Sequence, residues 1–151
     1  MPQSLARVVL HITFSTKNRK PFLRSADLRG ALDGYVVGIL KNQKCPSVIT
    51  RSVEDHIHIL CNLARTITIA KLLQEVKSDS SEWVKGHERG TSAFYWQNGY
   101  GAFSVSESNV ERVKEYIANQ EEHHRRMTFQ EEFRLLLERH KIEYDERYVW
   151  D

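Results

Sequence analysis

The first half of the chain carries a hydrophobic pattern whose period changes from one predicted element to the next. Hydrophobic residues alternate with polar ones over 8–15, and this period of two predicts a strand. Apolar residues recur at helical spacing over 25–40, which predicts a helix that ends before Pro46. Two short strands are expected over 47–51 and 56–63, joined by a polar turn.

The second half of the chain predicts three more helices and one strand. A helix is expected over 68–85, and an Asn-Gly turn signal then precedes a short strand at 103–105. Two capping boxes, Ser-x-x-Glu at 108–111 and Thr-x-x-Glu at 128–131, each predict the start of a helix. The first helix should run past Gln120, and the second is the last helix of the chain.

The predicted order of elements, β-α-β-β-α-β-α-α, indicates an α+β fold. It is close to the ferredoxin-like or RRM-like arrangement, an antiparallel sheet with helices on one face. A chain of 151 residues fits one domain, and the sequence shows no internal repeat and no linker rich in Pro, Gly or Ser. Residues 1–151 are therefore expected to form a single domain.

The composition is that of an ordinary folded protein, with 40% hydrophobic and 28% charged residues. No apolar run approaches the roughly 20 residues that span a bilayer, and the N-terminus lacks a signal-peptide core, so we expect a cytoplasmic protein with no membrane partner. Cys45 and Cys61 are too few for a disulfide framework, and Cys61 is expected to be a small buried hydrophobe. The formal net charge of +2 neither requires nor excludes a nucleic-acid partner.

The strand expected at 56–63 carries two histidines, His56 and His58, on one face. Successive side chains of a strand point to opposite sides, so these residues stand about 7 Å apart at Cα, opposite the apolar face of Ile57 and Ile59. Two neutral imidazoles at this spacing can converge on one divalent cation. The alternative is a pair of surface histidines with local hydrogen bonds, and a third ligand and a nucleophile are needed to reject it.

The helix expected after residue 108 supplies candidates for both missing groups. Tyr116 and Gln120 lie at i and i+4, on a stripe beside the apolar face of the helix. Gln120 offers a neutral oxygen ligand, and Tyr116 offers a hydroxyl about one helical turn away. His123 and His124 follow and are expected on the surface. Amphipathic helices often carry such a Tyr-x-x-x-Gln pair by chance, so the spacing gains weight only beside the His-Ile-His strand.

Four segments together carry a resemblance to a known family. They are "HITFSTKNRKPFL" near the start, "DHIHIL" in the middle, "FYWQNGYGAFSVSES" after the second predicted helix and "YIANQEEHH" in the third. Over nearly its whole length, the chain resembles the HUH-superfamily single-tyrosine transposases of bacterial and archaeal insertion sequences, including their repeat-associated relatives. The resemblance maps the family's metal ligands onto His56, His58 and Gln120, and its catalytic tyrosine onto Tyr116.

The resemblance implies an enzyme that cleaves and rejoins single-stranded DNA through a 5′-phosphotyrosine intermediate and recognises hairpins at the ends of a mobile element. It also implies a divalent metal, Mg²⁺ or Mn²⁺, no small-molecule cofactor, and a homodimer. The sequence leaves open whether Tyr116 acts with the histidines of its own chain or with those of a partner. The general base is also open between a water on the metal and His11, for which a structural hydrogen bond is the other interpretation.

Basic side chains in the first loop and along the second predicted helix are candidates for contacts with DNA phosphates. Trp96 or Tyr100 could stack on unpaired bases, although aromatic residues in such a segment more often belong to the core. The basic candidates are Lys17, Arg19, Lys20, Lys71, Lys77, Lys85 and Arg89.

The sequence also bears on three other functions. A non-catalytic RNA-recognition-type module would bind single strands on exposed sheet aromatics and would not need His56 or His58. A domesticated relative would keep the chemistry and act on dispersed genomic repeats. A zinc hydrolase of small molecules is disfavoured, because no third histidine or carboxylate stands at metal-ligand spacing in the sequence.

Overall fold

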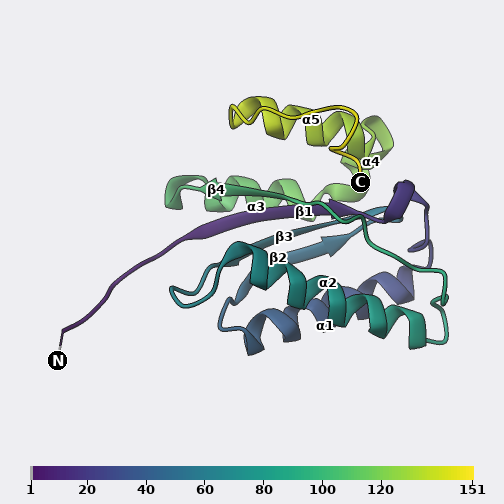
Figure 1. Ribbon diagram of the computed structural model, residues 1–151, viewed down its shortest axis with the longest axis horizontal. Helices are drawn as coiled ribbons and strands as arrows, with labels where there is room; N and C mark the ends of the chain where they lie inside the picture. The colour runs from purple at the N-terminus through teal and green to yellow at the C-terminus, as the bar shows by residue number, and fades with distance from the viewer. Residues whose placement is uncertain (1) are drawn as a thin grey trace.

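The computed structural model describes residues 2–151 and shows a four-stranded antiparallel sheet between two layers of helices (Figure 1). The strand order is β2-β3-β1-β4. The central pair is β1 (Val9–Ser15) and β3 (His56–Asn62), and the edges are β2 (Ser47–Ser52) and β4 (Gly101–Val105). The predicted strands are therefore confirmed to within a few residues.

The first layer consists of α1 (Ala26–Asn42) and α2 (Ile69–Gly86), which lie below the sheet in Figure 1. Both helices begin where the sequence predicts, because the hydroxyls of Ser25 and Thr68 each accept a hydrogen bond from a backbone amide of the first turn. The apolar sides of these helices and one face of the sheet form the largest hydrophobic core, which includes the buried, unpaired Cys45 and Cys61. The expected role of Cys61 as a small buried hydrophobe is confirmed.

The second layer covers the opposite face of the sheet and consists of α3 (Val110–Ala118), α4 (Gln120–Arg126) and α5 (Phe129–Arg139) (Figure 1). The α+β class and the antiparallel sheet are confirmed, but helices cover both faces where the sequence analysis expected one. The physical reason is that the sheet presents packable side chains on both sides. Within this layer, α3 packs on β2 and β3, and phenylalanines of α5 pack on Phe103 of β4.

Two boundaries in the second layer differ from the prediction. The expected capping box at 108–111 does not form. Ser108 lies in the short 3₁₀ helix η2 (Glu107–Asn109), and its hydroxyl is hydrogen-bonded to the hydroxyl of Ser106 instead of capping α3. The expected continuous helix past Gln120 is broken at Asn119, whose φ of −100° and ψ of 23° end α3. The capping box at Thr128 is confirmed, with both of its hydrogen bonds to Glu131 present.

None of the helices within residues 2–151 combines the length and apolar character that crossing a membrane requires.

Candidate catalytic and metal-binding site

His56 and His58 stand side by side on β3 beneath the second helical layer. Their ring centroids are 5.2 Å apart, and the two residues are only 1% and 0% exposed. Because α5 and the residues around Asn119 cover this face of β3, the alternative of two surface histidines is wrong. Two buried imidazoles need polar partners, and the partners define the site.

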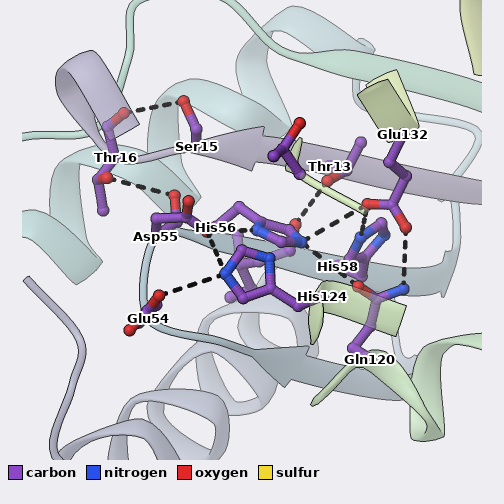
Figure 2. Close-up of polar contacts among 12 residues, drawn as sticks. Thr13, Ser15, Thr16, Glu54, Asp55, His56, His58, Gln120, His124 and Glu132 are labelled. Carbon is purple, nitrogen blue, oxygen red and sulfur yellow. Dashed lines mark hydrogen bonds and ion pairs between the residues drawn. The ribbon is translucent and has the colours of Figure 1, made fainter. Parts of the chain in front are cut away.

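Each imidazole uses its Nδ1 atom for a contact that orients the ring. His56 Nδ1 lies 2.7 Å from Asp55 Oδ1, and His58 Nδ1 lies 2.7 Å from His11 Nε2. Such contacts fix the tautomer and orientation of metal-binding histidines. Both Nε2 atoms are thereby directed towards the same region, where Gln120 and Glu132 meet them (Figure 2). His11 makes the structural hydrogen bond that was one of its two interpretations.

Gln120 reaches this region because the chain turns at Asn119 immediately before it. Its side chain is 2% exposed, and its Oε1 lies 3.3 Å from His56 Nε2. Tyr116 stands one helical turn earlier, with its ring centroid 6.1 Å from that of His58. The structure therefore brings Tyr116, His56, His58 and Gln120, the four predicted site residues, together within one chain.

Glu132 of α5 lies at the centre of the site, and the sequence analysis did not identify it. Its Oε1 lies 2.8 Å from His58 Nε2 and 3.5 Å from His56 Nε2. Its Oε2 accepts hydrogen bonds from the Tyr116 hydroxyl and, at 3.2 Å, from Gln120 Nε2. The fold therefore places a carboxylate beside the histidine pair, although none stands at metal-ligand spacing in the sequence.

The helical period of α5 contains a signal for Glu132 that could have been used. Phe129, Phe133, Leu136 and Leu137 bury one side of α5, and Glu132 falls among them at i+3 from the first. Glu132 is only 5% exposed. A carboxylate buried at a core position of an amphipathic helix needs a compensating partner. Which partner it finds depends on how α5 packs, which the sequence does not show.

The electrostatics of the site follow from burial and from the Glu132 carboxylate. Burial favours neutral imidazole, but the hydrogen bonds that His56 donates to the carboxylates of Asp55 and Glu132 outweigh burial and raise the pKa of His56 to about 9. For His58 burial prevails and the pKa is lowered, although Glu132 opposes this change. Burial and the neighbouring His58 lower the pKa of His11 to about 3. Burial would raise the pKa of Glu132, yet the two adjacent imidazoles hold it well below its ordinary value.

The pKa of Tyr116 is shifted in the direction opposite to that of an activated nucleophile. Burial and the negative charge of Glu132 raise the pKa of its phenol above the ordinary value of 10. The phenol is therefore protonated at neutral pH, and an attacking Tyr116 must lose its proton during the reaction.

The donor set fits a divalent cation. Two imidazole nitrogens, an amide oxygen and a carboxylate oxygen converge, and His56, His58 and Glu132 bring their ligand atoms within 4.8 Å of one another. Mixed nitrogen and oxygen donors of this kind suit Mn²⁺ and later metals, and oxygen donors also suit Mg²⁺. Asp55, His56 and His124 also bring their ligand atoms within 4.8 Å of one another, but His56 Nδ1 is already hydrogen-bonded to Asp55.

Comparisons with known proteins agree with this geometry. The family described as "Transposase IS200 like" matches residues 4–120, which is more than half of the chain. The chain belongs to this family. It is a single-tyrosine transposase of the HUH superfamily, and the resemblance inferred from the sequence is confirmed. No curated protein matches the sequence.

Two solved structures share the fold of this transposase. A protein from Deinococcus radiodurans R1 described as a transposase has a TM-score of 0.60 at 20% identity, with 80% of this chain and 95% of that chain covered. A REP-associated tyrosine transposase bound to a REP hairpin has a TM-score of 0.59 at 13% identity, with 82% and 73% covered. At these identities the two structures support the fold of the chain.

His123 and His124 of the transposase are closer to the site than the sequence analysis expected. Both are half-buried rather than surface residues. The ring of His123 lies 4.5 Å from that of Tyr116, and the ring of His124 lies 5.2 Å from that of His56. These contacts arise because α4 begins after the break at Asn119, which brings His123 beside Tyr116 of α3 and His124 beside His56 of β3.

Two of the candidate DNA contacts have structural roles instead. The Lys77 ammonium donates hydrogen bonds to the backbone oxygens of Gln97, Asn98 and Gly99, which uses all three of its donors. Trp96 is 6% exposed and donates to the Ser80 hydroxyl inside the core, as the core interpretation of this residue predicted. We therefore leave both residues out of the candidate DNA surface.

The other basic candidates lie at or near the surface, where their side chains make at most an ion pair or a contact with an aromatic ring. Arg19, in the 3₁₀ helix η1 (Lys17–Arg19), stacks on Trp150, while Lys71 and Arg89 form pairs with Glu75 and Asp27. Lys20 is exposed. The ammonium groups of Lys17 and Lys85 lie 6.0 Å and 3.9 Å from the centre of the Tyr95 ring, which is 53% exposed. We call Lys17, Lys85 and Tyr95 the cation–tyrosine patch.

Proposed function

We propose that this transposase cleaves and rejoins single-stranded DNA with Tyr116 as the nucleophile and a divalent cation held by His56, His58 and Gln120. One observation carries the proposal. The phenol and both imidazoles of a single chain contact the same buried carboxylate, that of Glu132, so nucleophile and metal ligands surround one small volume. A site built for structure alone would not need to bury three ionisable groups and an amide beside a half-buried phenol.

The chemistry follows from the groups present. The Tyr116 oxygen attacks the scissile phosphorus in line, the phenolic O–H bond breaks, and the bond from phosphorus to the 3′ oxygen breaks. The products are a 5′-phosphotyrosine and a free 3′-OH, which takes up one proton. A divalent cation held by His56, His58 and Gln120 would supply a Lewis acid that polarises the phosphate and stabilises the departing 3′ oxygen. Attack by a different 3′-OH on the phosphotyrosine reverses the step and joins new ends.

The phenol's proton has an acceptor in direct contact. The Tyr116 hydroxyl donates to Glu132 Oε2, whereas His11 is held by His58 through its Nε2. Geometry therefore favours Glu132 over His11 as the group that receives the proton. The hydrogen bond also fixes the direction in which the phenolic oxygen points.

A cavity beside Tyr116 offers a path for the DNA backbone. Its volume is about 180 Å³, and its lining includes Tyr116, Glu132, Arg126 and Arg139. Two guanidinium groups beside a nucleophilic phenol suit a phosphodiester, because arginine pairs with phosphate oxygens through parallel hydrogen bonds. The sequence analysis did not identify either arginine as part of the site.

The proposed nucleic-acid partner is single-stranded DNA with a hairpin. One protein of similar fold is a REP-associated transposase bound to a REP hairpin. In this chain, the cation–tyrosine patch supplies two ammonium groups for phosphates and an exposed ring for an unpaired base. The homodimer implied by the resemblance stays a prediction, and one chain already supplies every side chain of the site.

A non-catalytic module that binds strands on its sheet is disfavoured by the second helical layer. All seven residues of β1 and six of the seven in β3 are buried. No open sheet face is therefore available within residues 2–151 for stacking of bases.

The experiment that tests the proposal is formation of a covalent adduct. Wild-type protein is incubated with Mn²⁺ and single-stranded hairpin oligonucleotides that carry variable flanks, and products are resolved on a denaturing gel. Wild-type protein and Tyr148→Phe, a control at a 63% exposed tyrosine, should form the adduct. Tyr116→Phe should not, and an adduct of equal yield with Tyr116→Phe would refute the proposal.

A further inference from the structure

We propose that Glu132 is a further protein ligand of the divalent cation, so that two imidazoles, an amide and a carboxylate hold the ion. The inference deepens the proposed function and rests on the same site. Glu132 belongs to α5, and the family match ends at residue 120, before this helix begins. The carboxylate is thus a contribution of the C-terminal part of this chain.

The distances among the donor atoms support ligation. Glu132 Oε1 lies 2.8 Å from His58 Nε2 and 3.5 Å from His56 Nε2, and the latter lies 3.3 Å from Gln120 Oε1. Ligand atoms that are each about 2.1 Å from one cation, at angles between octahedral and tetrahedral, are roughly 3.0–3.4 Å apart. The three separations, 2.8, 3.3 and 3.5 Å, bracket this range, so small movements of the side chains would place all four donors around one cation.

The two oxygens of Glu132 contact different residues. Figure 2 shows one oxygen facing the histidines and the other facing Gln120. Oε2 accepts hydrogen bonds from Tyr116 and Gln120. Oε1 faces the two Nε2 atoms. One oxygen is thus satisfied by neutral donors, and the other is directed at the ring atoms that bind metals, which is the arrangement expected of a monodentate carboxylate ligand.

The position of Glu132 also calls for a cation. The residue is 5% exposed and lies between Phe129 and Phe133 on the packing side of α5. A carboxylate in such surroundings is costly unless a positive charge and hydrogen bonds compensate it. Without a bound cation the neighbouring imidazoles provide this compensation, and a divalent cation bound by His56 and His58 would take their place as the positive charge beside Glu132.

Ligation by Glu132 would connect three parts of the molecule. The same carboxylate would bind the ion through one oxygen and orient the Tyr116 hydroxyl through the other. Because Glu132 is carried by α5, binding of the ion would also stabilise the packing of α5 on the sheet.

The test is Mn²⁺ binding to the full chain in the absence of DNA. Free Mn²⁺ is measured by electron paramagnetic resonance for wild type, Glu132→Gln, His56→Ala and the control Glu138→Gln, which removes an exposed carboxylate from the same helix. We expect Glu132→Gln to weaken Mn²⁺ binding by at least about tenfold and Glu138→Gln to leave it unchanged. Circular dichroism verifies that each variant is folded.

The outcomes separate this inference from the proposed function. If folded Glu132→Gln binds Mn²⁺ as wild type does while His56→Ala does not, Glu132 is not a ligand and the proposed function is unaffected. If His56→Ala also binds as wild type does, the metal is not at this site and both proposals fail. Wild-type protein labelled with ¹³C at its glutamate carboxylates gives an independent measurement. A ¹³C hyperfine coupling to bound Mn²⁺ is expected, and its absence would overturn the inference even if Glu132→Gln does not fold.

Discussion

The hydroxyl of Tyr116 donates a hydrogen bond to the carboxylate of Glu132, which joins α3 to α5 within one chain. The other oxygen of that carboxylate lies 2.8 Å from His58 Nε2. The proposed nucleophile and a proposed metal ligand therefore contact the same group without any contribution from a second chain. The sequence left open whether Tyr116 acts in its own chain, and this arrangement favours that it does.

Mixing two inactive variants tests the one-chain arrangement. If each active site is completed by its own chain, a mixture of His58→Ala and Tyr116→Phe has no chain with both groups, and no covalent adduct should form. The measurement is the yield of adduct on a hairpin oligonucleotide, with a mixture of wild type and Tyr116→Phe as the positive control. Recovery of adduct in the first mixture would show that Tyr116 acts on the histidines of a partner.

Lys77 should matter for stability rather than for DNA binding. Its ammonium holds three consecutive backbone carbonyls of 97–99, and burial lowers its pKa to about 8. Replacement by alanine leaves these acceptors without their donor and should cost about 2 kcal/mol in the free energy of unfolding. The matched control is Lys71→Ala, whose 56% exposed side chain pairs with Glu75 and should contribute less than about 0.5 kcal/mol. Equal losses in urea denaturation for the two variants would contradict the structural role.

Asp33 should make the stability of the protein dependent on pH. Burial raises the pKa of this α1 carboxyl from 3.8 to about 6, although Ser52, Arg51 and Arg29 oppose the change. Because the folded state favours the protonated form, stability from this group is complete below pH 3.8 and is lost as pH rises through about 6.

The variant Asp33→Asn removes that loss. It should be more stable than wild type by about 1–2 kcal/mol at pH 8, and the difference should shrink as pH falls from 6 to 4. Thermal or urea unfolding at several pH values measures it, with the exposed Glu88→Gln as a control that should show no such trend. A difference that stays constant between pH 4 and pH 8 would refute the assignment.

The sheet and the first helical layer were predictable because local pattern determines them. The alternation in β1, the serine and threonine caps of α1 and α2, and the His-Ile-His strand are all properties of short segments. The position of the second layer was harder to predict. The sequence of a strand that can pack on both faces does not indicate which helices will cover each face.

Site residues that belong to a sequence motif were predicted, and the site residue that is brought in only by helix packing was missed. Tyr116 and Gln120 were predicted from their spacing only in combination with the His-Ile-His strand and the family resemblance, and the break at Asn119 that turns Gln120 inwards is a property of the folded chain. Glu132 was missed because it reaches His58 over 74 residues of sequence. A glutamate within the apolar stripe of α5 was the only local indication of its role.

The most direct test of the central claim is identification of the residue that becomes attached to DNA. Wild-type protein is incubated with Mn²⁺ and the hairpin oligonucleotide, the DNA is digested, and the peptides are analysed by tandem mass spectrometry. The account predicts a nucleotide joined through its 5′ phosphate to Tyr116. Attachment to another residue, or cleavage of the DNA with no attached nucleotide, would contradict it.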